Sequence, residues 1–198
     1  LRDLDELIGL ERVKKEVKTL TNYLNLQQRR REASLPEQQL SLHMVFEGNP
    51  GTGKTTVARI VGRIFKLLGL LKRGHLIETD RAGMVAEYAG QTAPKTHHKI
   101  DEALDGILFI DEAYSLVASG HEDAYGLEAV QALVKRMEDD RRRLVVIIAG
   151  YPEPIDQLLH SNPGLSSRFN TQLRFDDYLP TELARIFQLR CEANHYQL

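Results

Sequence analysis

The chain has 198 residues, of which 42% are hydrophobic and 27% are charged, a composition typical of a globular domain and too apolar for a disordered one. Its 26 basic and 28 acidic residues give a net charge of −2. There is therefore no global basic field to recruit nucleic acid or an acidic membrane, which argues against a DNA-binding module.

The single cysteine, Cys191, excludes an intrachain disulfide and fits a reducing compartment, so we expect a cytoplasmic protein. The longest apolar run, LVVIIAG at 144–150, is far shorter than the ~20 residues of a membrane helix, so no membrane insertion is expected. No secretory signal opens the chain. Because it begins with Leu1 rather than Met, we expect it to be a fragment of something longer.

Short apolar runs alternate with longer helical patterns along the chain, which indicates a parallel sheet covered by helices. A long amphipathic helix is predicted first, over 10–31. Strands are then predicted at 43–47, 76–79, 107–111, 144–149 and 172–175, with helices at 54–68, 92–104 and 123–138 between them. The third and fourth strands are apolar enough to be buried on both faces and should be central.

Two helix starts carry cap predictions. Thr92 is expected to cap the helix over 92–104, with Pro94 tolerated in its first turn. After Pro180 one more helix is predicted over 181–196, with Thr181 as its cap. This last helix looks like the first element of a truncated second unit.

Residues 48–55 read GNPGTGKT and match G-x-x-x-x-G-K-[ST] between a predicted strand and a predicted helix, the context that this motif requires. Its glycines let successive N–H groups face one anion, and the helix N-terminus adds about half a positive charge there. We expect Lys54 to reach the β- and γ-phosphates of ATP and the Thr55 hydroxyl to bind Mg²⁺. The alternative is a glycine turn that only joins strand to helix; the four fixed positions match by chance in about 1% of such chains.

ILFIDE, at 107–112, places two carboxylates at the carboxyl end of a buried strand, where ligands bind in open α/β sheets. Asp111 is expected to hold Mg²⁺, usually through water. Glu112 is expected to orient and polarise water for in-line attack on the γ-phosphorus, whereas a small-molecule kinase must exclude water. The alternative is a pair of solvated acids at the start of a loop.

Two further segments have both a functional and a structural interpretation. Arg168, in SSRF before the last strand, is either an arginine finger for a neighbouring subunit's γ-phosphate or one half of a surface ion pair. Tyr88, in EYAG, either grips an extended polypeptide in the pore of a ring or packs locally. His97 and His98 are adjacent on a helix and point in different directions, so they make a poor metal pair.

In this order, GNPGTGKT, EYAG, ILFIDE and NPGLSSRF resemble the AAA+ ATPases, and more narrowly their CbxX/CfqX branch, whose members act in Rubisco activation, sporulation and type VII secretion. The resemblance extends from ELIGLERVK at 6–14 to the helix after Pro180. It implies an α/β P-loop NTPase fold, a three-layer αβα core with a five-stranded parallel sheet. This core spans 1–179, with an N-terminal helical segment at 1–40 and the sheet and helices at 41–179. The first helix of a lid follows at 180–198, and the remainder of the lid is absent.

The resemblance also implies roles for individual residues. Asp111 and Glu112 form Walker B, and Glu112, Lys54 and Arg168 are the catalytic set. Tyr88, Ala89 and Gly90 form the pore loop, with a second pore loop at 118–125. The residues expected to contact the nucleotide are Ile8 and Gly9 beside the adenine, Asn49, Pro50, Gly51, Thr52, Gly53, Lys54, Thr55 and Thr56 in Walker A, and Tyr151.

The sequence departs from the family pattern at two points. Where the fourth strand often ends in a polar sensor such as Asn, it reads Ala149-Gly150-Tyr151, so Tyr151 is the candidate for that role. The sensor-2 arginine of the lid is missing, and neither Arg185 nor Arg190 has the motif context to replace it.

The sequence thus predicts a Mg²⁺-dependent ATPase core that assembles into a ring, expected to be a hexamer, and pulls or threads a protein substrate through its pore. A small-molecule P-loop kinase is one alternative, but it would need neither Glu112 nor Arg168. A nucleic-acid remodeller of the same superfamily is disfavoured by the net charge and the aromatic pore loop. An ATP-dependent scaffold is the third alternative.

Overall fold

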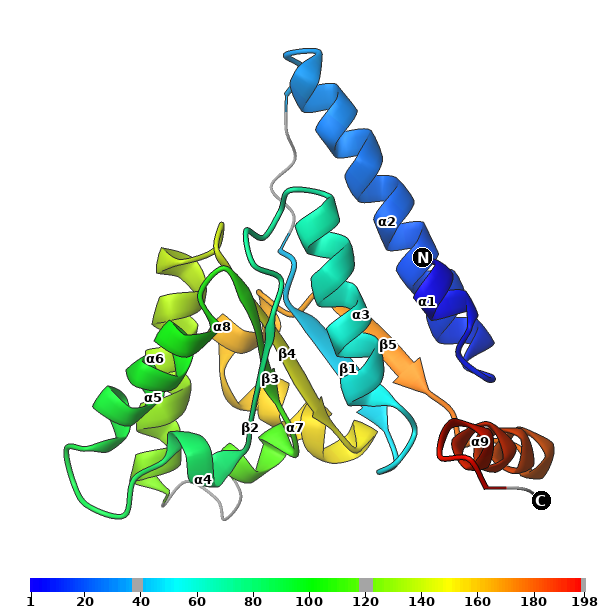
Figure 1. The fold of residues 1–198 in the computed structure, drawn as a ribbon. Coiled ribbons are helices and arrows are strands. Elements are labelled where there is room, and N and C mark those ends of the chain that lie inside the picture. Colours follow the sequence, from blue (N-terminus) through cyan, green and yellow to red (C-terminus); the bar gives the residue numbers. More distant parts are fainter. Residues whose placement is uncertain (37–40, 118–122, 197–198) are drawn as a thin grey trace.

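The computed structural model describes residues 1–36, 41–117 and 123–196. Its centre is a parallel sheet of five strands in the order β2-β3-β4-β1-β5 (Figure 1). The strands are β1 (Met44–Gly48), β2 (Leu76–Thr79), β3 (Gly106–Ile110), β4 (Leu144–Gly150) and β5 (Thr171–Phe175). The predicted strands are confirmed to within one residue at each end.

The two strands with the most apolar sequences lie in the interior of the sheet. Every residue of β3 and β4 is buried, and both strands have a neighbour on each side, which confirms that they are interior strands. At one edge, β5 alternates buried Leu173 and Phe175 with exposed Gln172 and Arg174. Strand β1 is also interior, between β4 and β5.

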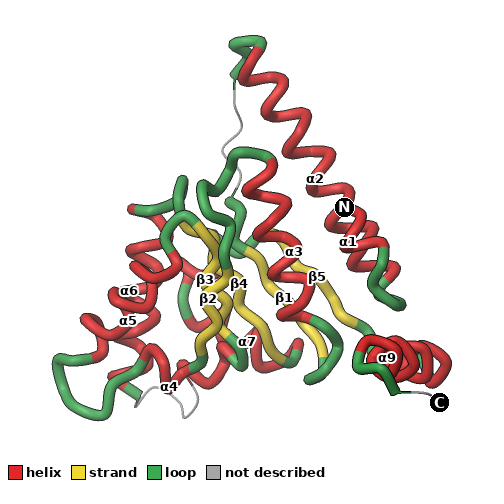
Figure 2. The backbone as a smooth tube through the Cα atoms, in the orientation of Figure 1, coloured by secondary structure: helices red, strands yellow, loops and turns green. Residues whose placement is uncertain are grey.

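Helices cover both faces of the sheet and make a three-layer αβα domain, as expected (Figure 2). One core cluster joins the sheet to the helices α2 (Glu11–Glu32) and α3 (Lys54–Leu67), with α1 (Arg2–Asp5) at its margin. The opposite cluster joins it to α5 (Thr92–Ala103), α6 (Ala124–Asp139), α7 (Pro152–Ser161), α8 (Pro163–Ser166) and the 3₁₀ turn η1 (Ala113–Val117). A short helix, α4 (Arg81–Met84), follows β2.

Both predicted caps are wrong. Thr92 is the first residue of α5 rather than its N-cap, and its Oγ1 accepts a hydrogen bond of 3.1 Å from the Ala86 N–H of the preceding loop. The last helix, α9 (Pro180–Ala193), begins one residue before Thr181 because a proline suits a first helical position. The Glu182 carboxylate caps it by accepting the Leu179 N–H at 2.8 Å.

Helix α9 lies beyond the carboxyl end of β5 and has no buried residue (Figure 1). Its apolar side chains include the exposed Leu183 and Phe187. Among the described residues, no helix combines the length and apolarity needed to cross a bilayer.

Candidate nucleotide site

The loop between β1 and α3 has the backbone of a phosphate-binding loop. Gly48, Gly51 and Gly53 have φ values of 153°, 78° and 90°, a region that favours glycine. A Cβ at Gly48 would lie 2.4 Å from the Phe175 carbonyl oxygen, whereas one at Gly51 would meet no atom within 4 Å. Gly48 is therefore required for close strand packing, and Gly51 faces open space.

Lys54 is folded back onto this loop. It is only 8% exposed, and its Nζ donates to the carbonyl oxygens of Gly48 at 2.9 Å and Asn49 at 2.8 Å. Burial lowers the Lys54 pKa, while Asp111 and Glu112 act in the opposite direction. The ammonium group is therefore held at the loop by two neutral acceptors, both backbone carbonyl oxygens.

The two acids follow β3 at the carboxyl edge of the sheet, as predicted. Asp111 Oδ1 accepts the Glu112 N–H at 3.0 Å, and the Asp111 N–H donates to the Thr79 carbonyl at 2.8 Å. Glu112 has a φ of 46°, in the left-handed region that a side chain rarely adopts. Such strain persists where surrounding contacts hold it, and it concentrates at functional sites.

One cavity of about 330 Å³ collects these groups. Of the predicted residues, it is lined by Pro50, Gly51, Gly53, Lys54, Thr55, Thr56, Asp111, Glu112 and Tyr151. Strand ends that are far apart in the sequence meet here because β1, β3 and β4 are neighbours in a parallel sheet. Tyr151 stands at the end of β4, with its ring centroid 6.2 Å from that of Tyr114.

Four other predicted contacts lie beside the cavity rather than on its lining. Asn49 Nδ2 donates to both carboxylate oxygens of Asp177 at 2.9 Å, and Thr52 Oγ1 donates to the Asn49 carbonyl at 2.8 Å. The segment of Ile8 and Gly9 reaches the loop through the next residue, Leu10, whose Cδ1 is 3.6 Å from a Cβ built at Gly53. The side chains of Asn49 and Thr52 thus hold the loop in shape.

The residues at this edge that were not predicted include Asp177, Tyr178 and Arg190, together with Tyr114 and Gly150 on the cavity lining. The Tyr178 hydroxyl donates to the Thr52 carbonyl at 3.3 Å, and burial raises its pKa. With Asp177 it closes the loop from the far side, and its place just after a strand's carboxyl end is a signal that could have found it. Arg190 of α9 lines the cavity, although its sequence context gave no reason to place it there.

Arg168 lies at the opposite edge of the sheet, just before β5 begins. Its Nη2 pairs with Glu138 Oε2 at 2.9 Å and its Nη1 donates to the Gly164 carbonyl at 3.0 Å, while Ser41 Oγ donates to the Arg168 carbonyl. Its Nε is buried and has no hydrogen-bond partner among the described residues. Arg168 cannot reach the nucleotide site of its own chain from this edge.

The EYAG segment lies between α4 and α5, with Tyr88 67% exposed. Gly90 has a φ of 76°, and a Cβ there would meet nothing within 4 Å. The base of the loop is fixed, because Thr96 Oγ1 donates to the Met84 carbonyl at 3.0 Å and Lys95 Nζ donates to the Val85 carbonyl at 3.0 Å. Tyr88 is therefore an exposed aromatic residue on an anchored loop.

In the predicted second pore loop, 118–122 lie outside the described residues, and Asp123 caps α6 and pairs with Arg81 at 2.5 Å.

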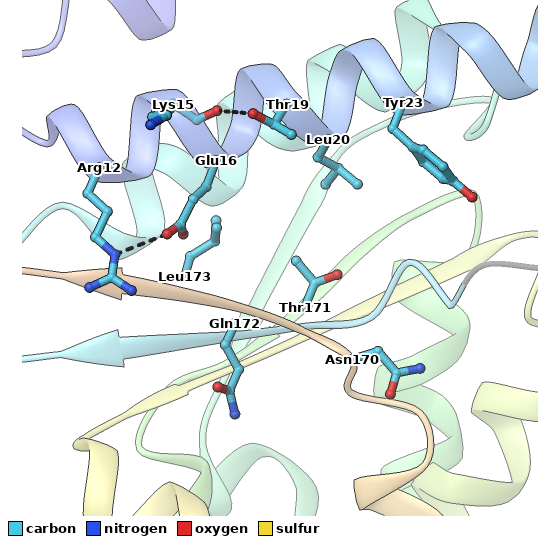
Figure 3. Close-up of a pocket in the computed structure, with 10 residues that line it drawn as sticks. All are labelled: Arg12, Lys15, Glu16, Thr19, Leu20, Tyr23, Asn170, Thr171, Gln172 and Leu173. Atoms are coloured by element: carbon cyan, nitrogen blue, oxygen red, sulfur yellow. Dashed lines mark hydrogen bonds and ion pairs between the residues drawn. The ribbon is translucent and has the colours of Figure 1, made fainter.

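A larger hollow, of about 780 Å³, lies between α2 and the edge strand β5 (Figure 3). Its lining includes Leu20, Gln172 and Leu173, and Arg12 Nε donates to Glu16 Oε1 at 3.0 Å along one side. None of the phosphate loop or Walker B residues lines it. The phosphate-loop and Walker B residues therefore gather on the smaller cavity, despite the greater volume of this groove.

The fold and the smaller cavity define a P-loop nucleotide-binding protein. The family described as "ATPase family associated with various cellular activities (AAA)" matches residues 44–177. The chain belongs to this AAA ATPase family and is of the CbxX/CfqX type.

The relatives include sporulation and secretion proteins. The chain is 45% identical over 197 residues to stage V sporulation protein K of Bacillus subtilis, with 100% of this chain and 61% of that protein covered. It is 50% identical over 194 residues to the ESX-1 secretion system protein EccA1 of Mycobacterium tuberculosis, with coverage of 97% and 34%. The chain thus spans about a third to three fifths of the length of these relatives.

The crystal structure of the FIGL-1 AAA domain in complex with ADP has the same fold, with a TM-score of 0.66 at 21% sequence identity. The similarity covers 95% of this chain and 60% of that one.

Proposed function

We propose that this chain is the ATP-hydrolysing core of a ring-forming AAA+ motor that remodels a protein substrate. The observation that carries the proposal is the convergence of Lys54, Thr55, Asp111 and Glu112 on one cavity at the carboxyl edge of the sheet. Lys54 supplies a cation for the phosphates, and Thr55 and Asp111 supply two oxygen ligands for a metal ion. Glu112 is then a further carboxylate that is not needed as a ligand.

The oxygen donors of this cavity fit Mg²⁺, which prefers hydroxyl, carboxylate and water ligands. Thr55 Oγ1 and the Asp111 carboxylate line the same space and would hold the ion, with water completing its shell. A bound Mg²⁺ would neutralise part of the negative charge on the β- and γ-phosphates.

The other side chains then have separate tasks. Lys54 turns from the loop carbonyls to the phosphates, and Glu112 orients a water molecule and polarises it toward the γ-phosphorus. Tyr151, at the end of β4, is placed to sense the γ-phosphate. A small-molecule kinase would exclude water from this point, whereas an additional carboxylate beside Asp111 favours hydrolysis.

Ring assembly is proposed from the place of Arg168. It lies at the amino edge of the sheet, away from its own nucleotide site, and an arginine there can serve a neighbour's γ-phosphate. In a ring of six, Tyr88, Ala89 and Gly90 would project into the pore and grip an extended polypeptide by apolar contact. The exposure of Tyr88 and the fixed base of its loop support this role. We further propose that α9 begins a lid subdomain.

Two substitutions in the full-length protein test the chemistry. Glu112→Gln should bind ATP with Mg²⁺ yet lose hydrolysis by about 100-fold or more, because the amide cannot act as the base. Lys54→Ala should lose nucleotide binding. Glu153→Gln, which neutralises an exposed carboxylate on α7, is the control and should keep wild-type turnover. Wild-type turnover in Glu112→Gln would refute the assignment of the base, and a phosphorylated acceptor in place of free phosphate would support a kinase.

A further inference from the structure

Glu78 of β2 contacts the Thr55 side chain and, with Asp111 and Glu112, lines a hollow of about 480 Å³ beside the nucleotide cavity. Thr55 Oγ1 donates to Glu78 Oε1 at 3.2 Å, and Arg59 Nη2 donates to Glu78 Oε2 at 3.1 Å. Each carboxylate oxygen therefore has its own partner. The sequence offered no motif for Glu78, which is 23 residues from Thr55 in the chain.

The fold makes this contact in two steps. Side chains alternate along β2, so Glu78 shares a face with Leu76, which packs in the α3 cluster, whereas Ile77 packs in the opposite cluster. Thr55 and Arg59 are four residues apart on α3 and so lie on the same side of the helix, one turn from each other. The Glu78 carboxylate, on the face of β2 that is turned toward α3, can therefore bind Thr55 and Arg59 together.

The contact determines where the Thr55 hydroxyl proton points. A hydroxyl has one proton and two lone pairs, and a cation is bound through a lone pair. When Glu78 accepts the hydrogen bond of the Thr55 hydroxyl, the lone pairs of the hydroxyl oxygen are left for the cavity that Thr55 lines with Asp111. Arg59 fixes the orientation of the accepting carboxylate through its ion pair with the second oxygen.

We propose that Glu78 is a positioning residue for the magnesium site: it accepts the hydrogen bond from the Thr55 hydroxyl and so presents the lone pairs of the hydroxyl oxygen to Mg²⁺. The inference rests on the proposed nucleotide site and adds a residue to it. Groups that orient metal ligands in this way typically change metal affinity by about 10- to 100-fold when they are removed. Two other roles are distinguishable: an ion pair with Arg59 that only stabilises the fold, and direct binding of the metal by Glu78.

The test is calorimetric titration of the full-length protein with a non-hydrolysable ATP analogue at a series of Mg²⁺ concentrations and in EDTA. Glu78→Ala should raise the Mg²⁺ concentration that gives half of the gain in affinity by about tenfold. Its affinity in EDTA should stay within about twofold of wild type, because the phosphate loop is untouched. Glu78→Gln keeps an acceptor oxygen, so its Mg²⁺ requirement should fall between those of wild type and Glu78→Ala. Arg59→Ala should cause a smaller rise, since it frees the carboxylate without removing it.

Asp3→Ala is the matched control. Asp3 pairs with Arg63, which is one turn further along α3, at 2.7 Å, and this pair is about as exposed as the Glu78–Arg59 pair. If Glu78 only stabilises the fold through an ion pair, both variants should lower the melting temperature and neither should change the Mg²⁺ requirement. That result would overturn the inference.

The Thr55→Ala background separates positioning from direct binding. If Glu78 acts through the Thr55 hydroxyl, Glu78→Ala should add less than about twofold to the Mg²⁺ requirement of Thr55→Ala. A full tenfold addition would show that Glu78 acts on the metal by itself and would overturn the positioning role. Absence of any Mg²⁺-dependent gain in the wild-type protein would overturn the proposed function and this inference together, whereas a normal wild-type gain that is unchanged in Glu78→Ala would overturn the inference alone.

Discussion

Acid should destabilise this domain through one buried histidine, His43, at the amino edge of β1. The residue is 4% exposed, and the Val146 N–H donates to its Nδ1 at 2.9 Å, so this nitrogen must be unprotonated. Burial lowers the His43 pKa from 6.5 to about 4; the positive charge of Arg168 adds to this, and a hydrogen bond with the Met137 backbone opposes it. The folded state therefore keeps His43 neutral at pH values where the unfolded chain protonates it.

The sign and size of the effect follow by linkage. Below pH 6.5 the unfolded chain takes up a proton that the folded chain refuses, so stability falls as the pH drops and stops falling near pH 4. The difference between a pKa of 6.5 in the unfolded chain and about 4 in the folded chain corresponds to roughly 3 kcal/mol of the free energy of unfolding, all of it lost at pH values below both pKa values. Between about pH 7.5 and about pH 5, His43 should cost the domain roughly 2 kcal/mol of its free energy of unfolding.

Urea denaturation of wild type and His43→Asn at these two pH values measures the effect. The asparagine Oδ1 occupies the position of the histidine Nδ1, so it can still accept the Val146 N–H, but it does not titrate. The variant should therefore lose about 2 kcal/mol less than wild type on acidification. His160→Asn, which removes an exposed histidine from α7, controls for the loss of one titratable side chain and should behave as wild type. Equal losses in wild type and His43→Asn would refute the assignment of the acid sensitivity to His43.

Three further predictions concern nucleotide and substrate. Tyr88→Ala should keep basal ATP hydrolysis within a few-fold but abolish substrate remodelling and its stimulation of hydrolysis; a lower melting temperature with normal remodelling per folded molecule would instead identify a packing residue. Mixed rings of Arg168→Ala and Lys54→Ala protomers should recover part of the ATPase activity because some interfaces are intact on both sides, and no recovery in proven mixed rings would contradict action in trans. Tyr178→Phe should weaken ATP binding by about fivefold, measured by calorimetry, because it removes the hydrogen bond to the Thr52 carbonyl. Unchanged affinity would show that packing of the aromatic side chain, without its hydroxyl group, is enough to hold the phosphate loop.

The sequence determined the local structures whose signal is contiguous. The burial of β3 and β4 follows from unbroken apolar runs, and the phosphate loop follows from glycines and a lysine in one short segment. Helix α7 was not predicted, although its sequence is also local; it contains Pro152 and Pro154. In the structure both fall in the first turn, where a proline costs no intrahelical hydrogen bond.

The tertiary structure alone decided which distant side chains meet at the site. The contacts of Thr55 with Glu78 and of Thr52 with Tyr178 join segments 23 and 126 residues apart, and Arg190 reaches the cavity from the last helix. These contacts depend on the order of the strands and on the face that each residue presents. A local pattern fixes the conformation of its own segment, but no segment of the sequence states which strand will lie beside it.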